Sequence, residues 1–188
     1  MGNEIIENLQ DLPEGGALLY EGNRYLLLPP ESLTEFQRGM EAQLGADKVG
    51  LVLYRSALRQ GRLLTDYFRS AALLQDDEAV RFMTRLVRQM GWGRPEIINL
   101  SIGHVTLELE VYHSAFAEGY HKAGNPVCHL LRGFYAGILG SVCGAEVDGL
   151  ETRCRAVEGP GPCSFVFAAA IHSSLEITSN PAKMSECE

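Results

Sequence analysis

The chain has 188 residues, of which 46% are apolar and 21% charged, and its formal net charge at pH 7 is -8. This length predicts a single globular domain with its own buried core. The negative charge argues against nucleic acid or an anionic membrane surface as the main partner. We expect no membrane span, because the sequence has no apolar run of about 18 residues. The first residues have no secretory signal pattern, so we expect a cytoplasmic protein with reduced cysteines.

The N-terminal segment predicts one β-hairpin. Residues 1–16 are polar and are expected to form a loose lead-in. The apolar segments 17–20 and 25–28 flank Gly22-Asn23, and this pair supplies the positive φ angles that a two-residue turn needs. We therefore expect the folded domain to begin with a tight hairpin after the lead-in.

Three helices are expected next, because apolar residues recur at spacings of three and four. They cover residues 31–44, 49–72 and 76–90. Gly45 is the expected stop of the first helix, and Gly61 marks a bend or a close contact in the second. The first helix has the apolar stripe Leu33, Phe36, Met40 and Leu44.

The C-terminal half predicts two strand pairs around a helix. Apolar and polar residues alternate over residues 105–111, which are expected to pair with 96–102. After a short helix or loop, a helix led by a proline is expected over residues 126–143. Strands over 147–157 and 164–171 form the last hairpin.

The order of these elements indicates the fold class. Hairpin, helices, hairpin, helix and hairpin in succession exclude a parallel Rossmann sheet. They predict an α+β fold in which an antiparallel sheet built from hairpins carries helices on one face. We expect one domain over residues 17–171 and a flexible tail over 172–188, which contains Cys187.

Three cysteines and a glutamate are candidate metal ligands. Cys154 and Cys163 can face each other across the base of the last hairpin. Cys128 falls in the first turn of the preceding helix, where the helix N-terminus favours a thiolate. Glu151 lies three residues before Cys154, on the opposite face of a regular strand, so a shared site requires a β-bulge. Zinc binds such groups in tetrahedral sites, but a disulfide or plain burial of the cysteines fits the same spacing.

Several short segments of the C-terminal half together carry a family signature. They are Asn125-Pro126-Val127-Cys128, the helix with Gly133 and Gly137, Glu151-Thr152-Arg153-Cys154, and Gly159 followed by Cys163-Ser164-Phe165. These segments resemble the 4-vinyl reductase domain. That family includes small proteins linked to bacteriochlorophyll synthesis and the sensor modules of aromatic-responsive transcription activators. Its fold is similar to that of TRAPP trafficking subunits.

The resemblance implies a site and a partner state. It implies zinc held by Cys128, Glu151, Cys154 and Cys163, a ligand cavity between the helices and the sheet, and a homodimer. Three thiolates and a carboxylate leave no open position for water, which favours a structural metal over a catalytic one. Cys143 and Cys187 match no ligand position; we expect Cys143 to be buried.

Candidate ligand contacts are aromatic residues at element ends or on the glycine-bearing helix, and a histidine beside the central strand. They are Trp92, His113, Phe116, Tyr120, Phe134 and Tyr135. Gly133 and Gly137 share one helix face, which leaves room for a ligand or for a neighbouring helix. Core packing explains each aromatic residue as simply, and a lone histidine is usually a surface or hydrogen-bonded residue.

Two classes of function follow from these features. The first is a binding protein, a sensor or carrier of an apolar, aromatic or tetrapyrrole ligand. The alternative is a 4-vinyl reductase or its accessory in (bacterio)chlorophyll biosynthesis. Reduction needs a hydride or electron source, and the sequence has no dinucleotide-binding glycine fingerprint or flavin motif. The binding role is therefore favoured over independent catalysis, and a pure interaction module is a third possibility.

Overall fold

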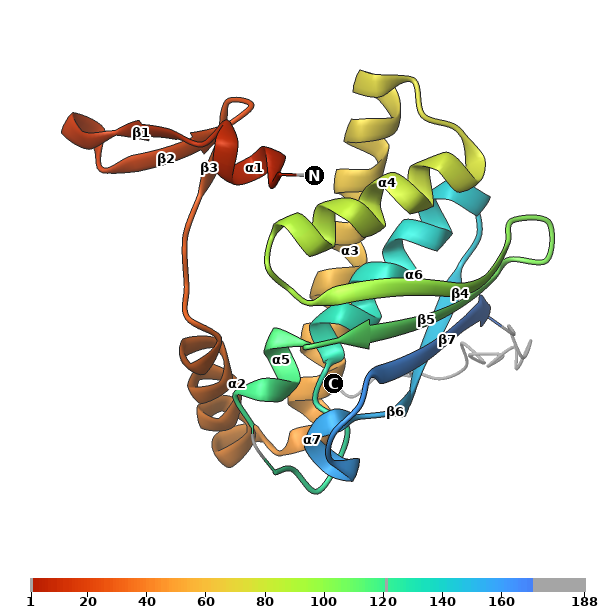
Figure 1. The fold of residues 1–188 in the computed structure, drawn as a ribbon. Helices are drawn as coiled ribbons and strands as arrows, with labels where there is room; N and C mark the ends of the chain where they lie inside the picture. The colour runs from red at the N-terminus through yellow and green to blue at the C-terminus, as the bar shows by residue number, and fades with distance from the viewer. Residues whose placement is uncertain (1, 121, 171–188) are drawn as a thin grey trace, which may run out of the picture.

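The computed structural model describes residues 2–120 and 122–170. Figure 1 shows a small N-terminal sheet beside a larger body of helices and a second sheet. The predicted tail over 172–188, with Cys187, lies outside the described residues. The N-terminal elements are α1 (Glu4–Glu7), β1 (Gln10–Leu12), η1 (Pro13–Gly15), β2 (Ala17–Tyr20), β3 (Asn23–Tyr25) and α2 (Pro30–Leu44). The body consists of α3 (Ala46–Ala72), α4 (Asp76–Gln89), β4 (Arg94–Ser101), β5 (Thr106–Tyr112), α5 (Ala115–Glu118), α6 (His129–Cys143), β6 (Val147–Arg153), α7 (Arg155–Glu158) and β7 (Cys163–Ala169).

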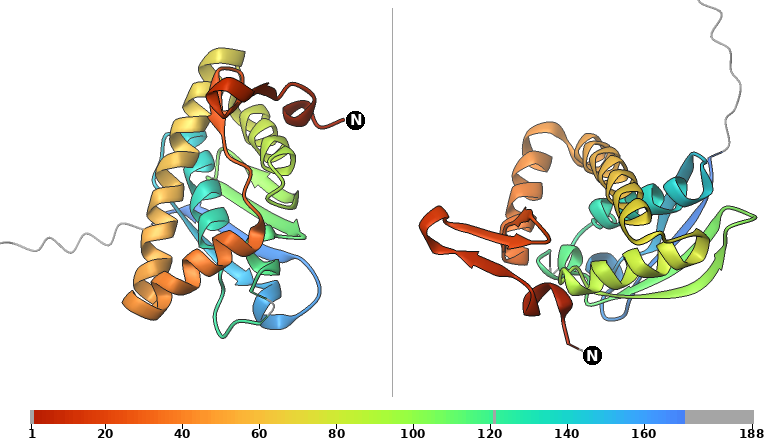
Figure 2. Two further views of the ribbon diagram at one scale, coloured as in Figure 1. Left: turned by 90° about the vertical axis from the view of Figure 1, so that its left-hand side faces the viewer. Right: turned by 90° about the horizontal axis from the view of Figure 1, so that it is seen from above.

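The body is built on a four-stranded antiparallel sheet with the strand order β4-β5-β7-β6. Along β5, the alternate residues Leu107, Leu109 and Val111 are buried, as expected for a strand with one face against the core. α4 and α6 pack on the sheet, and α3 packs against α6 (Figure 1 and Figure 2). This arrangement confirms the predicted α+β fold.

The helices α3 and α6 approach each other along a row of glycines. A Cβ atom at Gly133 would lie 2.1 Å from the carbonyl oxygen of Tyr54. A Cβ atom at Gly137 would lie 2.1 Å from the carbonyl oxygen of Leu58, and Gly61 on α3 is similarly close to the α6 backbone. Only glycine permits such backbone contact. The glycine face of α6 therefore receives a neighbouring helix and leaves no room for a ligand there.

The N-terminal hairpin turns one residue earlier than the sequence predicts. The turn residues with positive φ are Glu21 (48°) and Gly22 (76°), and Asn23 is already the first residue of β3. β3 has only three residues, so the predicted strand residues 26–28 form an extended, exposed linker instead. The lead-in also contains structure, because Asn3 caps α1 and β1 pairs with β2.

Two helices differ in detail from the prediction. The buried residues of α2 are Thr34 and Gln37, whereas Phe36 of the predicted apolar stripe is 70% exposed. The reason is that α2 meets the body through hydrogen-bonding side chains. The predicted helix start at Pro126 is wrong, since α6 begins at His129. In the described part of the chain, no helix is long and apolar enough to cross a membrane.

Candidate metal centre and adjacent cavities

The four candidate metal ligands come from separate elements and meet at one end of the large sheet. Cys128 is the residue before α6, Glu151 lies in β6, Cys154 follows β6, and Cys163 begins β7. Their donor atoms all lie within 4.8 Å of one another, and all four residues are buried. The structure therefore brings these residues into one group, which we call the Cys3Glu cluster.

An irregularity in β6 makes this grouping possible. Glu151 pairs with Phe165, but Arg153 pairs with Ser164, so the strand register shifts between the two pairs. The shift turns Glu151 and Cys154 to the same side, although they are three residues apart. This is the β-bulge that the sequence requires for a shared site.

Arg153 fastens the connection between the two hairpin cysteines. Its guanidinium donates hydrogen bonds to the backbone carbonyl oxygens of Gly159 (3.3 Å), Pro160 (2.8 Å) and Pro162. A Cβ atom at Gly161 would lie 2.8 Å from this guanidinium, so the loop is closed tightly over it. The bonds fix the loop between Cys154 and Cys163. The sequence analysis assigns no role to Arg153 itself.

The sulfur spacing fits a metal ion better than a disulfide. The Sγ atoms of Cys128 and Cys163 are 3.7 Å apart, and both cysteines are free. A disulfide needs about 2.05 Å between its sulfur atoms. Two sulfurs that each lie about 2.3 Å from a tetrahedral zinc ion are about 3.8 Å apart. The predicted alternative of a disulfide is therefore not present among the described cysteines.

Backbone and side-chain groups around the cluster orient its donors. The backbone N–H of Cys128 donates to Oε2 of Glu151 at 3.0 Å, whereas the buried Oε1 atom has no hydrogen-bond partner among the described residues. The backbone N–H of Arg155 donates to Sγ of Cys163 at 3.3 Å, and Oγ of Ser114 lies 3.4 Å from Sγ of Cys128. Such surrounding bonds fix metal ligands in place, and the free Oε1 atom is the oxygen that a metal would take.

The cluster resists full ionisation on its own. Hydrogen bonds from the Cys128 and Cys163 thiols lower the pKa of Cys154. Burial and the negative sulfur of Cys154 raise the pKa of Glu151 to about 8. The pKa of Cys128 is raised, chiefly because its thiol bonds to Cys154, so the favoured thiolate is Cys154 and not Cys128 as the helix position predicts. A divalent cation at the centre would offset the repulsion between these groups.

The donor set can hold a metal ion with four protein ligands. Thiolate sulfurs select zinc and other soft or borderline metals, and a carboxylate completes a tetrahedral shell. Such a closed shell provides a structural staple, because it ties the start of α6 to both strands of the last hairpin. It has no open position for an attacking water.

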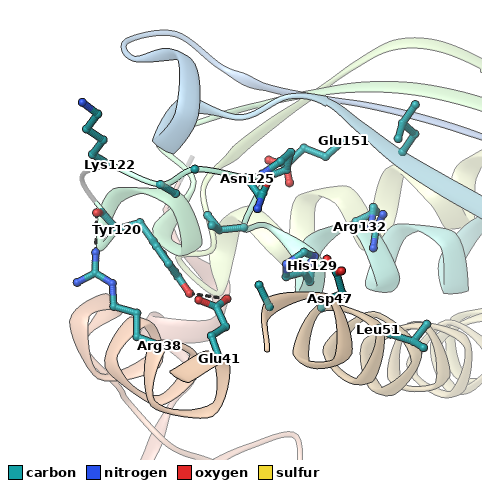
Figure 3. Close-up of a pocket in the computed structure, with 17 residues that line it drawn as sticks. Arg38, Glu41, Asp47, Leu51, Tyr120, Lys122, Asn125, His129, Arg132 and Glu151 are labelled. Atoms are coloured by element: carbon teal, nitrogen blue, oxygen red, sulfur yellow. Dashed lines mark hydrogen bonds between the residues drawn. The ribbon is translucent and has the colours of Figure 1, made fainter. Parts of the chain in front are cut away.

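A polar cavity of about 640 Å³ lies next to the cluster, between α2, α3 and the start of α6. Figure 3 shows the charged residues that line it, and Glu151 is the one cluster residue on its wall. His129 and Arg132 project into it from α6, and Glu41 and Asp47 reach it from α2 and α3. The sequence analysis missed this cavity, because its residues come from elements that only the fold brings together.

A smaller apolar hollow of about 50 Å³ lies between α2, α3, α5 and α6. Two of the predicted ligand residues, Phe116 and Tyr120, line it. Tyr120 also lines the polar cavity, and its hydroxyl donates to Oε1 of Glu41 at 3.0 Å. The remaining apolar lining includes Leu33, Met40, Leu53 and Leu130.

The other predicted ligand residues lie elsewhere. The Trp92 ring packs edge-on against Phe116 and Phe134, with ring centroids 5.3 and 5.0 Å apart. Phe134 and Tyr135 are fully buried in the core. His113 has an exposed side chain, and its Nδ1 atom lies 3.3 Å from Oε1 of Glu118. The structure thus places two of the six aromatic and histidine candidates at the hollow, three in the core behind it and one on the surface.

Comparison with known proteins gives both family and fold. Residues 107–169 match the family model of the 4-vinyl reductase domain, and the search of curated proteins found no match. The chain resembles the crystal structure of the phenol-responsive sensory domain of the transcription activator PoxR with phenol, at a TM-score of 0.74 and 18% identity over 88% of this chain and 87% of that one. It also resembles a vinyl-4-reductase family protein from Methanocaldococcus jannaschii, at a TM-score of 0.52 and 16% identity over 90% and 89% of the two chains. A third likeness is to a trafficking protein particle complex subunit 3 from Naegleria fowleri covalently bound to palmitic acid, at a TM-score of 0.52 and 13% identity over 76% and 95%.

These structural likenesses, at low sequence identity, show a shared fold. The family model adds a sequence match that covers β5, α6 and the last hairpin, and thus all four residues of the Cys3Glu cluster. Residues 107–169 therefore form a segment of the 4-vinyl reductase domain, which confirms the family that the sequence motifs indicate.

Proposed function

We propose that the chain is a zinc-stapled small-molecule-binding protein, a sensor or carrier of an apolar, aromatic or tetrapyrrole ligand. The observation that carries the zinc assignment is the buried cluster of Cys128, Glu151, Cys154 and Cys163, whose sulfur spacing suits a tetrahedral zinc ion. The binding role is supported by the match to the family model and by the likeness to a sensory domain described as phenol-responsive.

The apolar hollow at Phe116 and Tyr120 is the ligand site in this proposal. Its volume of about 50 Å³ is below the roughly 150 Å³ of a cavity that admits benzene. A phenol-sized ligand therefore requires α2 to move outward. Side chains of α2 resist this movement, because Gln37 donates to the Val127 carbonyl oxygen at 3.4 Å and Arg38 to that of Tyr120 at 2.7 Å. Ligand binding and the position of α2 are thus coupled.

The remaining predicted ligand residues have indirect roles in this proposal. Trp92, Phe134 and Tyr135 form a row of ring contacts that begins at Phe116, so they adjust to a ligand through that ring. His113 points away from the hollow toward Glu118, and no observation supports a ligand contact for it.

A partner for the signal follows from the exposed surface. Large apolar side chains remain exposed in the N-terminal part of the chain, and such patches mark interaction sites. Leu26 and Leu27 are each 75% exposed, and Phe36 on α2 is 70% exposed. We propose that a second copy of the chain covers this surface in a homodimer in the cytoplasm. A ligand that displaces α2 would then alter the dimer contact.

The alternative function is a 4-vinyl reductase, or its accessory, in (bacterio)chlorophyll biosynthesis. The observation in its favour is the likeness to a protein described as a vinyl-4-reductase family member. The four protein ligands of the cluster argue against metal-assisted turnover, because they leave no position for a substrate. Reduction of a vinyl tetrapyrrole by the purified chain and NADPH alone would establish the enzyme and displace the binding role.

Thermal unfolding with phenol tests the ligand site. Phenol is expected to raise the unfolding temperature of the full chain, and Phe116→Trp, which fills the hollow, is expected to abolish the rise. The matched control is Tyr67→Trp on α3, whose side chain is half exposed and outside the hollow. No stabilisation of the unmodified chain by phenol, or an equal rise in Phe116→Trp, contradicts the proposed site.

A further inference from the structure

We infer that the polar cavity between α2, α3 and α6 binds a small organic anion, a carboxylate or a phosphate ester, whose charged group Arg132 recognises. The cavity volume of about 640 Å³ lies within the range of roughly 300–1,000 Å³ that is typical of small-molecule sites. Tyr120 lines both this cavity and the apolar hollow. The lining of the two differs, however, and occupation of the polar cavity does not require the phenol-type ligand.

Arg132 is an unpaired cation on the cavity wall (Figure 3). Its side chain makes no hydrogen bond or ion pair with any described residue, and its Nε atom is buried. The guanidinium stacks on the ring of Tyr54, 4.6 Å from the ring centroid. The Tyr54 hydroxyl is itself fixed, because it accepts a hydrogen bond from the Gly149 amide at 3.2 Å. Stacking uses the face of the guanidinium and leaves the N–H groups at its edge for a planar oxyanion.

Two long helices begin at the cavity and add to the positive potential. α3 follows Gly45 and α6 follows Cys128, and neither residue gives a side-chain hydrogen bond to the first helical amides. The amides of a first turn and the helix dipole both favour an anion. His129 adds an imidazole that makes no hydrogen bond within the described chain. Its ring lies against Gly50, where a Cβ atom would come within 2.8 Å of it, so the imidazole is held in place.

The acidic residues on the wall leave Arg132 without a partner. Oε1 of Glu41 accepts hydrogen bonds from two neighbouring side chains, at 2.9 and 3.0 Å. Glu151 accepts the amide of the residue before α6 and belongs to the Cys3Glu cluster. Asp47 makes no side-chain hydrogen bond within the described chain, and Lys122 adds an exposed cation at the edge. An anion in the cavity would supply the charge that Arg132 lacks, at a cost of repulsion from Asp47.

The mouth of the cavity selects an organic ion over an inorganic one. Leu51 on α3 and Leu150 on β6 both line it, and they are 48% and 60% exposed. These two side chains offer apolar contact for the body of a ligand whose charged group lies at Arg132. Inorganic phosphate has no such body and is expected to bind more weakly.

Isothermal titration calorimetry of the zinc-loaded full chain tests the site with benzoate, phenyl phosphate, their neutral analogue benzamide, and inorganic phosphate. At least one organic anion is expected to bind, and the stronger of the two identifies the preferred charged group. Arg132→Gln is expected to weaken that binding by roughly 10-fold to 100-fold, the usual worth of charge-assisted hydrogen bonds. Asp47→Asn is expected to strengthen it by about 2-fold to 5-fold. The control Arg88→Gln, at an exposed position on α4 away from the cavity, should leave it unchanged.

Several results would overturn the inference. They are the absence of binding by both organic anions, equal affinity for benzamide, equal affinity for inorganic phosphate, and unchanged affinity in Arg132→Gln. Zinc content and the melting temperature show whether Arg132→Gln folds. If it does not fold, Asp47→Asn decides the matter, because a merely structural role for the cavity predicts no gain in anion affinity. Failure of phenol to bind leaves these outcomes unaffected, since the probes and the variants differ.

Discussion

The two ends of the described chain are attached to the body in contrasting ways. At the C-terminal end, the Cys3Glu cluster and the Arg153 hydrogen bonds tie β6, α7 and β7 to the start of α6. At the N-terminal end, the small sheet β1–β3 is joined through the exposed residues 26–28, and Asn3 donates one hydrogen bond to the Gln89 carbonyl oxygen on α4. The first region has the features of a fixed scaffold, and the second has those of a segment that a ligand or a partner can displace.

The largest expected effect is the loss of one cluster ligand. Cys154→Ser removes a thiolate and leaves the other donors buried around a weakened site, so we expect it to destabilise the zinc-loaded chain by about 3–5 kcal/mol. Thermal and urea unfolding measure this change. The control Cys143→Ser lies outside the cluster, where Sγ is 3.7 Å from the Ile102 carbonyl oxygen, and its cost should be below about 1 kcal/mol. Equal stabilities of the two variants would contradict a structural metal.

The contact between α3 and α6 should be nearly as sensitive. Gly137→Ala places a Cβ atom 2.1 Å from the Leu58 carbonyl oxygen, so the helices must separate. We expect a loss of about 2–4 kcal/mol in the free energy of unfolding. Gly39→Ala on α2 is the matched control, because nothing lies within 4 Å of its Cβ position. That variant should gain about 0.5–1 kcal/mol from helix propensity. A destabilised Gly39→Ala with an unaffected Gly137→Ala would reverse this assignment of the tight and open faces.

A smaller effect is expected at Arg153. Arg153→Gln removes the bonds to the loop over residues 159–162 but no metal donor. We expect a loss of about 1–2 kcal/mol in stability and a zinc affinity roughly 10-fold lower, as for other residues that position metal ligands. Competition with a chromophoric chelator measures the affinity. An unchanged affinity would show that the cluster does not need the loop to be fastened.

The smallest effect on stability should come from the N-terminal linker. Leu27→Ser replaces a side chain that is 75% exposed, so the unfolding free energy of the monomer should change by less than about 0.5 kcal/mol. If a second copy covers this surface, sedimentation equilibrium should show weaker dimerisation. A dimer of unchanged strength in Leu27→Ser would place the interface elsewhere.

Local chemistry made much of the cluster predictable from sequence. The offset of three residues between Glu151 and Cys154 demands a bulge, and the structure has one between Glu151 and Arg153. The glycines of α6 likewise indicated a close contact, although they could not show whether a helix or a ligand fills it. These predictions succeeded because each depends on residues that are near in sequence or on one element.

The features that the sequence did not predict depend on tertiary contacts or on a one-residue choice. Arg132 reaches the polar cavity only because α3 and α6 start side by side, which no spacing in the sequence reveals. The N-terminal turn could use Gly22 as its first or its second residue, and the pairing of β2 with β3 selects the second. The start of α6 shifted to His129 because the preceding residues connect to the cluster before the helix begins.

Native mass spectrometry of the freshly purified chain is the most direct test of the metal staple. We predict one zinc ion per chain in the unmodified protein and none in Cys154→Ser at the same concentration. An unmodified chain that carries no zinc, and takes none up from solution without loss of its fold, would contradict the account.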